Sequence, residues 1–275
     1  RVPSWLHTLA TFLVAFGTTM SAFWILVLNS WMQTPQGFEM IEGVAHVTSW
    51  YEVILNPSLP YRFSHMLLAS FLTVSFLIAG ISAYRWLIGG RTEGVRAALV
   101  SAVVAAAVLI PVQIVVGDAH GLNTLEHQPQ KIAAMEANWD TPGSVPLVLF
   151  AIPDETAREN KFEIAIPNGA SLILTHSLDG AVPMLNDFVA EDGTPLHPPV
   201  VPLFFSFRVM VGIGFLMLGV SWGTLYLMLR KRKDGQGRRG VRANPSTTDH
   251  TVSSRASTPP SGVHRRATHG CMPTL

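Results

Sequence analysis

The sequence contains few charged side chains and a single cysteine. Charged residues make up 13% of its 275 residues, about half the proportion found in ordinary soluble domains. Because Cys271 has no second cysteine to pair with, a disulfide bond within the chain is excluded. Phosphate-binding loops, nucleophile elbows, zinc-ligand patterns and nucleic-acid-binding modules are also missing. No common soluble catalytic motif is therefore present, and nothing points to a nucleic-acid partner.

Long apolar runs are what the sequence has instead. Four of them are long enough to cross a bilayer as helices, since a span needs about 20 residues; they cover residues 8–31, 63–86, 95–116 and 201–229. None alternates polar and apolar residues as a membrane barrel strand would. The sequence therefore predicts an all-α fold, an integral membrane helical bundle with four transmembrane helices.

Charge is distributed unevenly along the chain. Arg85, Arg91 and Arg96 surround the connection after the second apolar run, and basic residues 230–233 follow the fourth. Most acidic residues lie between the third and fourth runs, in residues 118–200. Because basic connections face the cytoplasm, we expect the acidic loop to be periplasmic and the C-terminal tail to be cytoplasmic.

These patterns divide the chain into four parts. Residues 1–117 hold membrane helices 1–3, residues 118–200 the periplasmic loop, residues 201–229 membrane helix 4, and residues 230–275 a basic tail. The loop is too long and polar for a simple connector, and its apolar stretches predict that it packs against something. The tail has few large apolar residues and is expected to be disordered. It either contacts anionic lipid or results from a frame-shifted or prematurely ended reading frame.

Two potential metal ligands lie inside apolar runs, where polar side chains are costly and often functional. His65 is near the outer end of the second run, and Met210 lies in the outer half of the fourth. An imidazole and a thioether on separate helices can be the axial ligands of a haem iron. No C-x-x-C-H motif is present, so such a haem would be non-covalent and of b type. The alternatives are an interfacial histidine and an ordinary core methionine.

Other polar residues allow more than one interpretation. Arg208, inside the fourth run, would pair with a haem propionate, tune the iron by its charge, or extend to the lipid headgroups. Lys131 and Glu136 are separated by about 140° around a helix and should make separate contacts. They suit a polar substrate, although spacing alone favours a solvated helix face. His120 and His127 are expected in the loop, without companions for a metal.

Several strings in the sequence resemble subunit I of the cytochrome bd-type quinol oxidases. The likeness covers residues 5 to about 230, where the pattern stops. Its matching strings are residues 21–33 (SAFWILVLNSWMQ), 52–57 (EVILNP), 63–65 (FSH), 80–84 (GISAY), 117–118 (GD), 131–141 (KIAAMEANWDT) and 202–215 (PLFFSFRVMVGIGF). The loop is short for this family, as in the branch that includes cyanide-insensitive oxidases.

The resemblance implies roles for particular residues. His65 and Met210 match the axial ligands of the low-spin haem b that accepts electrons from quinol, and Arg208 matches the arginine beside that haem. Lys131 and Glu136 match loop residues implicated in binding and oxidising quinol. The substrate would be ubiquinol or menaquinol. The setting would be aerobic respiration in the bacterial inner membrane, with subunit II and lipid as partners.

The family's other cofactors have no ligands in this sequence. The full-length subunit also binds a second haem b and the haem d that reduces oxygen, but the four apolar runs contain neither an acid nor a second histidine at membrane depth. The chain, which begins at Arg1, is therefore expected to be a central fragment that holds the quinol-oxidising site without the oxygen site. The alternatives are a non-catalytic truncated membrane protein and a haem-b membrane anchor of another dehydrogenase.

Overall fold

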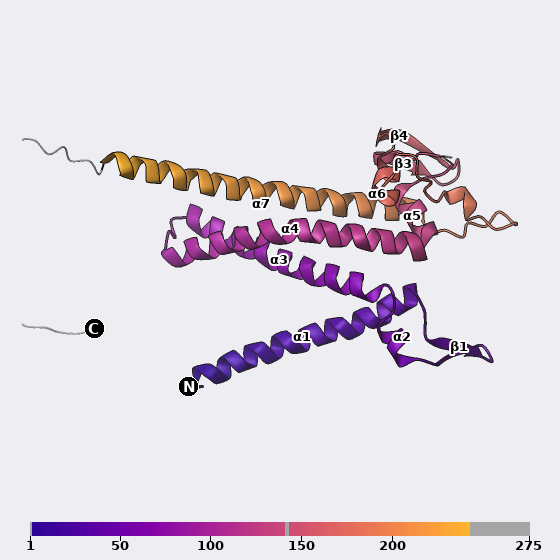
Figure 1. Ribbon diagram of the computed structural model, residues 1–275, viewed down its shortest axis with the longest axis horizontal. Coiled ribbons are helices and arrows are strands. Elements are labelled where there is room, and N and C mark those ends of the chain that lie inside the picture. The colour runs from indigo at the N-terminus through magenta and orange to yellow at the C-terminus, as the bar shows by residue number, and fades with distance from the viewer. Residues whose placement is uncertain (1, 141–142, 243–275) are drawn as a thin grey trace, which may run out of the picture. The chain divides into compact units, whose positions relative to one another are not determined.

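The computed structural model describes residues 2–140 and 143–242, and the side chains through residue 231. The chain divides into two units, Arg1–Arg230 and Lys231–Leu275. Figure 1 shows the order of the elements. They are α1 (Ser4–Gln33), β1 (Phe38–Ile41), β2 (Val44–Val47), α2 (Trp50–Ile54), α3 (Leu59–Leu87), α4 (Glu93–His127), α5 (Pro129–Glu136), β3 (Leu147–Asp154), β4 (Glu159–Ile166), α6 (Gly169–Thr175), the short 3₁₀ helix η1 (Leu185–Asp187) and α7 (Val200–Arg242).

Four helical segments are long and apolar enough to cross a membrane: α1, α2 with α3, α4, and the Val200–Lys231 part of α7. This confirms the predicted helical membrane fold and its four spans. Two features were not predicted, namely the antiparallel hairpins β1–β2 and β3–β4. Both lie in connecting segments outside the four spans, so they add small sheets to a mainly helical chain.

The hairpin of α3 and α4 is the main helix pair, and Figure 1 shows the two helices side by side. Its turn uses Gly89 at φ +97°, a conformation that glycine adopts without strain. Thr92 then caps α4 by accepting a hydrogen bond from the backbone N–H of Val95. Trp222 of α7 donates to the backbone carbonyl of Ala107 on α4, which joins the fourth span to this pair.

The third span is longer than the sequence predicted. We expected its helix to end at residue 116 and a loop to begin at residue 118, but α4 continues through Pro111 to His127. Its last turns are held by packing, since Asn123 and Thr124 are buried. The helix ends where Pro129 restricts Gln128 to a non-helical conformation. His120 and His127 therefore lie on a helix and not in a loop.

The segment between α4 and α7 has a core of its own, as its apolar stretches predicted. Strands β3 and β4 pair with Leu147 opposite Ile166 and Asp154 opposite Glu159. One buried cluster joins α5, β3, η1 and the start of α7, and consists of Ala133, Ala134, Ala137, Trp139, Val148, Ala151, Leu185, Val200 and Phe204. The segment is thus a packed unit that fixes the position of α5.

A buried polar network joins the C-terminal ends of α1 and α4 to the start of α3. Asn56, fully buried, donates to Ser30 and accepts from Thr34, at 2.9 and 3.2 Å. The Thr34 hydroxyl also lies 3.0 Å from the Ser58 hydroxyl, which donates to Asn123 on α4. Because each of these hydrogen bonds satisfies a buried polar atom, the network fixes the three helices relative to one another.

The tail begins as a helix and not as a disordered segment. We expected disorder from Arg230 onward, but α7 continues to Arg242. No proline interrupts the helix in this part, although it includes Gly235, Gly237 and Gly240, which disfavour helices. The remaining residues of the predicted tail, 243–275, lie outside the described part of the chain.

Candidate functional site

His65 lies on the face of α3 that meets α4. Its Nε2 is 3.1 Å from the side-chain amide nitrogen of Gln113, and its ring centroid is 5.9 Å from that of His120. A β-carbon at Gly117 would come within 3.2 Å of the imidazole Cε1, so glycine lets the ring lie against α4. The Nδ1 atom of His65 is buried and has no hydrogen-bond partner in the described part of the structure.

Met210 and Arg208 lie close together on α7 but have different surroundings. Met210 is 51% exposed in this chain, so its thioether is open to a partner. The Arg208 side chain is 13% exposed, and its Nη2 donates to Glu136 Oε2 at 2.7 Å. Its Nε donates to the backbone carbonyl of Val148, and the guanidinium lies 4.8 Å from the centroid of the Phe204 ring. The structure therefore pairs Arg208 with protein groups.

Glu136 ends α5 and is buried, with 7% of its side chain exposed. The spacing of Lys131 and Glu136 favoured a solvent-exposed helix face for both residues, and this interpretation is wrong for Glu136. The next residue, Ala137, adopts a left-handed conformation with φ +52°, which turns the chain away from the helix axis. Asn160 of β4 stabilises this turn by donating to the Ala137 carbonyl at 3.0 Å and accepting from Trp139 Nε1 at 3.0 Å.

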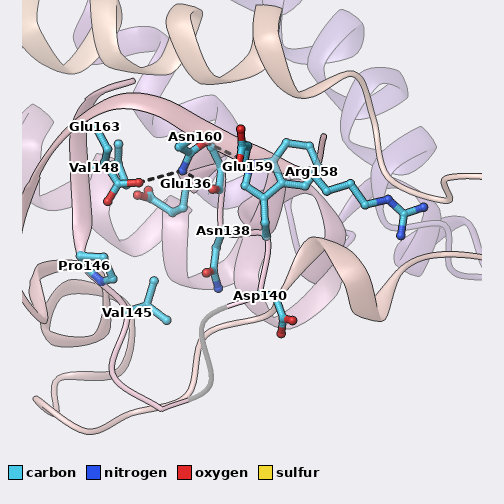
Figure 2. Close-up of a pocket in the computed structure, with 12 residues that line it drawn as sticks. Glu136, Asn138, Asp140, Val145, Pro146, Val148, Arg158, Glu159, Asn160 and Glu163 are labelled. Carbon is cyan, nitrogen blue, oxygen red and sulfur yellow. Dashed lines mark hydrogen bonds between the residues drawn. The ribbon is translucent and has the colours of Figure 1, made fainter. Parts of the chain in front are cut away.

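A pocket of about 240 Å³ opens beside Glu136. Its wall comes from the end of α5, the residues that follow it, and the β3–β4 hairpin; the polar and charged residues that line it are Glu136, Asn138, Asp140, Arg158, Glu159, Asn160 and Glu163. Figure 2 shows Asn160 hydrogen-bonded to Glu163, and the Arg158 side chain extending away from this pair. Trp139, Val145, Pro146 and Val148 add apolar surface. Such a lining offers a ligand both hydrogen-bonding groups and apolar contact.

Lys131, on the same helix as Glu136, faces different neighbours. It is half-buried and does not line the pocket. Burial, followed by the positive charge of Arg62, lowers the pKa of Lys131 below its ordinary value. The structure thus places the two predicted α5 residues in separate environments, since Glu136 pairs with Arg208 and lines the pocket whereas Lys131 does not line it.

The predicted haem ligands, His65 and Met210, carry donor atoms of the kind that bind a haem iron. His65 offers an imidazole whose Nδ1 has no partner among the described residues, and a single ring nitrogen is what a haem iron requires from histidine. The lack of a β-carbon at Gly117 lets that ring lie against α4, and Met210 is an exposed residue in this chain. An imidazole nitrogen and a thioether sulfur are both donors that a haem iron accepts. Among the described residues there is no cluster of three or more His, Cys, Asp or Glu that would hold a free metal ion.

Sequence reasoning missed the contacts made by Arg62, Gln113 and Asn160. Arg62 donates to Asn29 at 3.2 Å, and Gln113 contacts His65 from the next helix. A polar residue inside an apolar run was a usable signal for Gln113, whereas Arg62 lies just before the second run. Nothing in the sequence marked Asn160, because its role depends on a hairpin that the pattern of residues did not reveal.

Known proteins similar to this chain were found by sequence and by structure. Cytochrome bd ubiquinol oxidase subunit 1 of Bacillus subtilis is 33% identical over 238 residues, covering 84% of this chain and 51% of that protein. Cytochrome bd-II ubiquinol oxidase subunit 1 of Escherichia coli is 30% identical over 300 residues, covering 85% and 58%. The bd oxidase structure from Geobacillus thermodenitrificans matches with a TM-score of 0.69 and 32% identity, covering 80% of this chain and 50% of that one.

The chain spans about half the length of these relatives. The family model for cytochrome bd terminal oxidase subunit I matches residues 1–256, which extends beyond the end near residue 230 that we expected for the likeness. Four apolar helices and these relatives together describe a multi-pass membrane protein. Both relatives are named as quinol oxidases, which makes the family one of oxidoreductases. On this evidence the chain belongs to the cytochrome bd terminal oxidase subunit I family.

Proposed function

We propose that this chain is the quinol-oxidising, low-spin haem b portion of a bd-type terminal oxidase. The observation that carries the proposal is the 2.7 Å ion pair between Glu136 and Arg208. It joins the helix that ends at the pocket to the helix that carries Met210, two residues beyond Arg208. Glu136, the proposed acceptor of the quinol protons, and Met210, the proposed ligand of the haem that accepts the electrons, would therefore lie on two helices that this ion pair joins.

In this proposal His65 and Met210 hold the haem b from α3 and α7. A haem b bound there supplies a one-electron acceptor close to the substrate. Gln113 orients His65 through the contact at its Nε2, and Gly117 allows the ring to lie close to α4. Such neighbours of a ligand set its orientation.

Glu136 is the proposed proton acceptor for quinol. Oxidation of quinol releases two protons, and a general base must lie within hydrogen-bond reach of the hydroxyl that it deprotonates. Arg208 fixes one carboxylate oxygen of Glu136, and the pocket lies beside the same side chain. Substitution of Arg208 would therefore alter both the position and the charge balance of the base.

The rest of the oxidase is needed for the complete reaction. The second haem b, haem d and subunit II are proposed to belong to the remainder of subunit I and to its partner. The apolar windows of the four spans are between 6% and 28% buried within this chain, so most of their surface is available to lipid or to other helices. The loop of residues 118–200 is proposed to face the periplasm, and the end of α7 the cytoplasm.

The first test is a reduced-minus-oxidised absorption spectrum of the purified chain in detergent. A low-spin b-type signal that His65→Ala removes, and that lacks a haem d band, supports the proposal. A spectrum without haem in a folded chain favours the non-catalytic membrane protein. A signal that persists in His65→Ala eliminates the assigned ligand and favours a haem anchor of a different kind.

The second test separates substrate chemistry from haem binding, and it uses the whole oxidase that contains this chain. Glu136→Gln should lower quinol oxidation by about 10²–10⁴-fold, the usual contribution of a general base, with haem content unchanged. Glu136→Asp, which keeps the charge, should lose less. Glu191→Gln is the matched control, because Glu191 is exposed and lies outside the pocket. Unchanged turnover in Glu136→Gln would refute the role of this carboxylate.

A further inference from the structure

The outer face of the β3–β4 hairpin is apolar and uncovered in this chain. The inner face packs on the core through Val148 and Ala151, and it lines the pocket with Asn160 and Glu163. The apolar side chains that the two strands leave exposed are Leu149, Phe150, Ile152, Phe162, Ile164 and Ile166. An exposed apolar cluster of this kind marks a surface that contacts protein or membrane.

Phe162 is the most exposed of these side chains and has a strained backbone. It is 78% exposed, and its φ of +54° is one that bulky residues rarely adopt. It belongs to a bulge, because β4 has two residues between Lys161 and Ile164 where β3 has only Ala151. The fold therefore keeps an aromatic side chain exposed in a costly conformation, and an apolar partner would offset that cost.

Hydrogen bonds place the hairpin along the first turns of α7. Near the turn of the hairpin, Glu155 Oε1 accepts from the backbone N–H groups of Val200 and Val201, at 2.9 and 3.2 Å. Toward its open end, the Val148 carbonyl accepts from Arg208, about two helical turns further along α7. Figure 1 shows the hairpin beside this end of α7. Strand β3 thus runs antiparallel to the start of the fourth span.

The length of the fourth span gives the depth of the hairpin in the membrane. A hydrocarbon core of about 30 Å takes about 20 helical residues, and counted back from Leu229, before the basic end of the span, these reach Met210. Arg208 is then at the boundary between acyl chains and headgroups, and the open end of the hairpin lies beside it. The polar turn at residues 155–158 lies farther out, next to Val200.

We propose that the outer face of the β3–β4 hairpin lies in the membrane interface and contacts lipid acyl chains beside α7. The Phe150 ring centroid is 6.3 Å from that of Phe205 on α7. Exposed Val209 and Ile213 follow Phe205 at intervals of four residues, on the same side of the helix. The apolar surface of the hairpin therefore continues that of a membrane span, and lipid contact would remove it from water.

This inference goes beyond the proposed function and holds whether or not His65 binds a haem. Because the opposite face of the same hairpin lines the pocket, lipid contact would also fix the distance of the pocket from the bilayer. A second candidate for the same surface is another part of the oxidase, which the experiment must distinguish from lipid.

Nitroxide labels on single cysteines report what covers the hairpin. The sample is the whole oxidase in phosphatidylcholine nanodiscs, with Cys271 and any other reactive cysteine replaced, and the label is attached to Ile164→Cys, Phe162→Cys or Ile152→Cys. Electron paramagnetic resonance then measures relaxation of each label by oxygen, which concentrates among acyl chains, and by a water-soluble nickel chelate. Thr156→Cys is the matched control, because Thr156 is exposed in the turn of the same hairpin.

Lipid contact predicts a graded result. Oxygen should relax the labels at Ile164 and Phe162 more strongly than the nickel chelate does, and the order should be reversed at Thr156. The ratio of oxygen to nickel accessibility should rise from Thr156 through Ile152 to Ile164, because Ile152 pairs nearer the turn than Ile164 does. A surface covered by protein has no reason to show this gradient.

Two results would overturn the proposal. Strong relaxation by the nickel chelate at Ile164 and Phe162, as at Thr156, would place the face in water. Weak relaxation by both reagents would mean that another part of the oxidase covers it. If one labelled variant fails to assemble, the others answer the same question. The absorption spectrum and quinol turnover of the same oxidase test the proposed function separately.

Discussion

Arg208 binds two structural elements at once. Its guanidinium donates to the Glu136 carboxylate and to the Val148 carbonyl, while its face lies on Phe204. Arg208→Gln would leave Glu136 charged and buried without a partner, at a cost of about 3–5 kcal/mol in the free energy of unfolding. Thermal unfolding of the detergent-solubilised chain measures this.

A double-mutant cycle provides the control for that prediction. The pair Arg208→Gln with Glu136→Gln should be less destabilised than the sum of the single changes, because neither charge is then left alone. Arg208→Lys should fall between wild type and Arg208→Gln, since it keeps the charge but loses the planar group that reaches two acceptors. Strictly additive single changes would mean that the ion pair contributes nothing.

Gly117 and Gly121 form a matched pair on α4. A β-carbon at Gly121 would meet nothing within 4 Å, whereas one at Gly117 would press on the His65 ring. Gly121→Ala should therefore stabilise the helix by about 0.5–1 kcal/mol, and Gly117→Ala should gain less and displace the imidazole. Thermal unfolding and the imidazole NMR signals of His65 test the two effects. Equal stabilisation with unmoved signals would contradict this packing.

At the scale of elements, the polar network around Asn56 holds α1, α3 and α4 together. Asn56→Ala removes the partner of both Ser30 and Thr34 in a fully buried position, and should destabilise the chain by about 1–3 kcal/mol. Ser101→Ala is the control, because the exposed Ser101 hydroxyl bonds only to a carbonyl in its own helix. A loss in Asn56→Ala no larger than in the control would show that the network does not join the helices.

The β3–β4 hairpin should respond to acid through Asp154. Hydrogen bonds from Lys161, at 2.6 Å, and from the backbone N–H groups of Ala157 and Thr156 lower the pKa of Asp154 from 3.8 to about 2. Because the folded pKa is lowered, the stabilisation is present above the unfolded value and disappears as the pH falls through the folded one. A carboxyl NMR titration measures this pKa directly. Lys161→Met should raise it, and an ordinary pKa in the wild type would refute the assignment.

The elements also show what the sequence could and could not predict. Hydropathy identified the four spans because an apolar run of sufficient length has few alternatives to a membrane helix. It missed the end of α4, because Gly117 and Asp118 are poor helix formers that tertiary packing overrides. It missed β3 and β4, whose strands are paired by a register that only the folded segment specifies.

For the candidate site, the predictable part was the type of residue, and the unpredictable part was its partner. His65, Met210, Arg208, Lys131 and Glu136 were marked by polarity within apolar runs or by the family resemblance. The pairing of Arg208 with Glu136 joins residues far apart along the chain, and a single sequence contains no signal for such a contact.

At the scale of the whole molecule, orientation in the membrane remains a prediction from charge. The connection between α3 and α4 contains Arg91, while the exposed Thr156 lies in the turn of the β3–β4 hairpin. If basic connections face the cytoplasm, these two positions lie on opposite sides of the bilayer. Because Cys271 is the only cysteine, Cys271→Ser provides a background in which one new cysteine at either position can be labelled.

In intact cells with a permeable outer membrane, a membrane-impermeant maleimide should label Thr156→Cys at once. Arg91→Cys should react only after the inner membrane is disrupted. Both positions are exposed in the structure, so a difference in labelling reports the side of the membrane and not burial within the protein. The opposite order would place the pocket and Glu136 on the cytoplasmic side, and quinol oxidation there would release its protons inward. The proposed path of protons to the periplasm depends on this result.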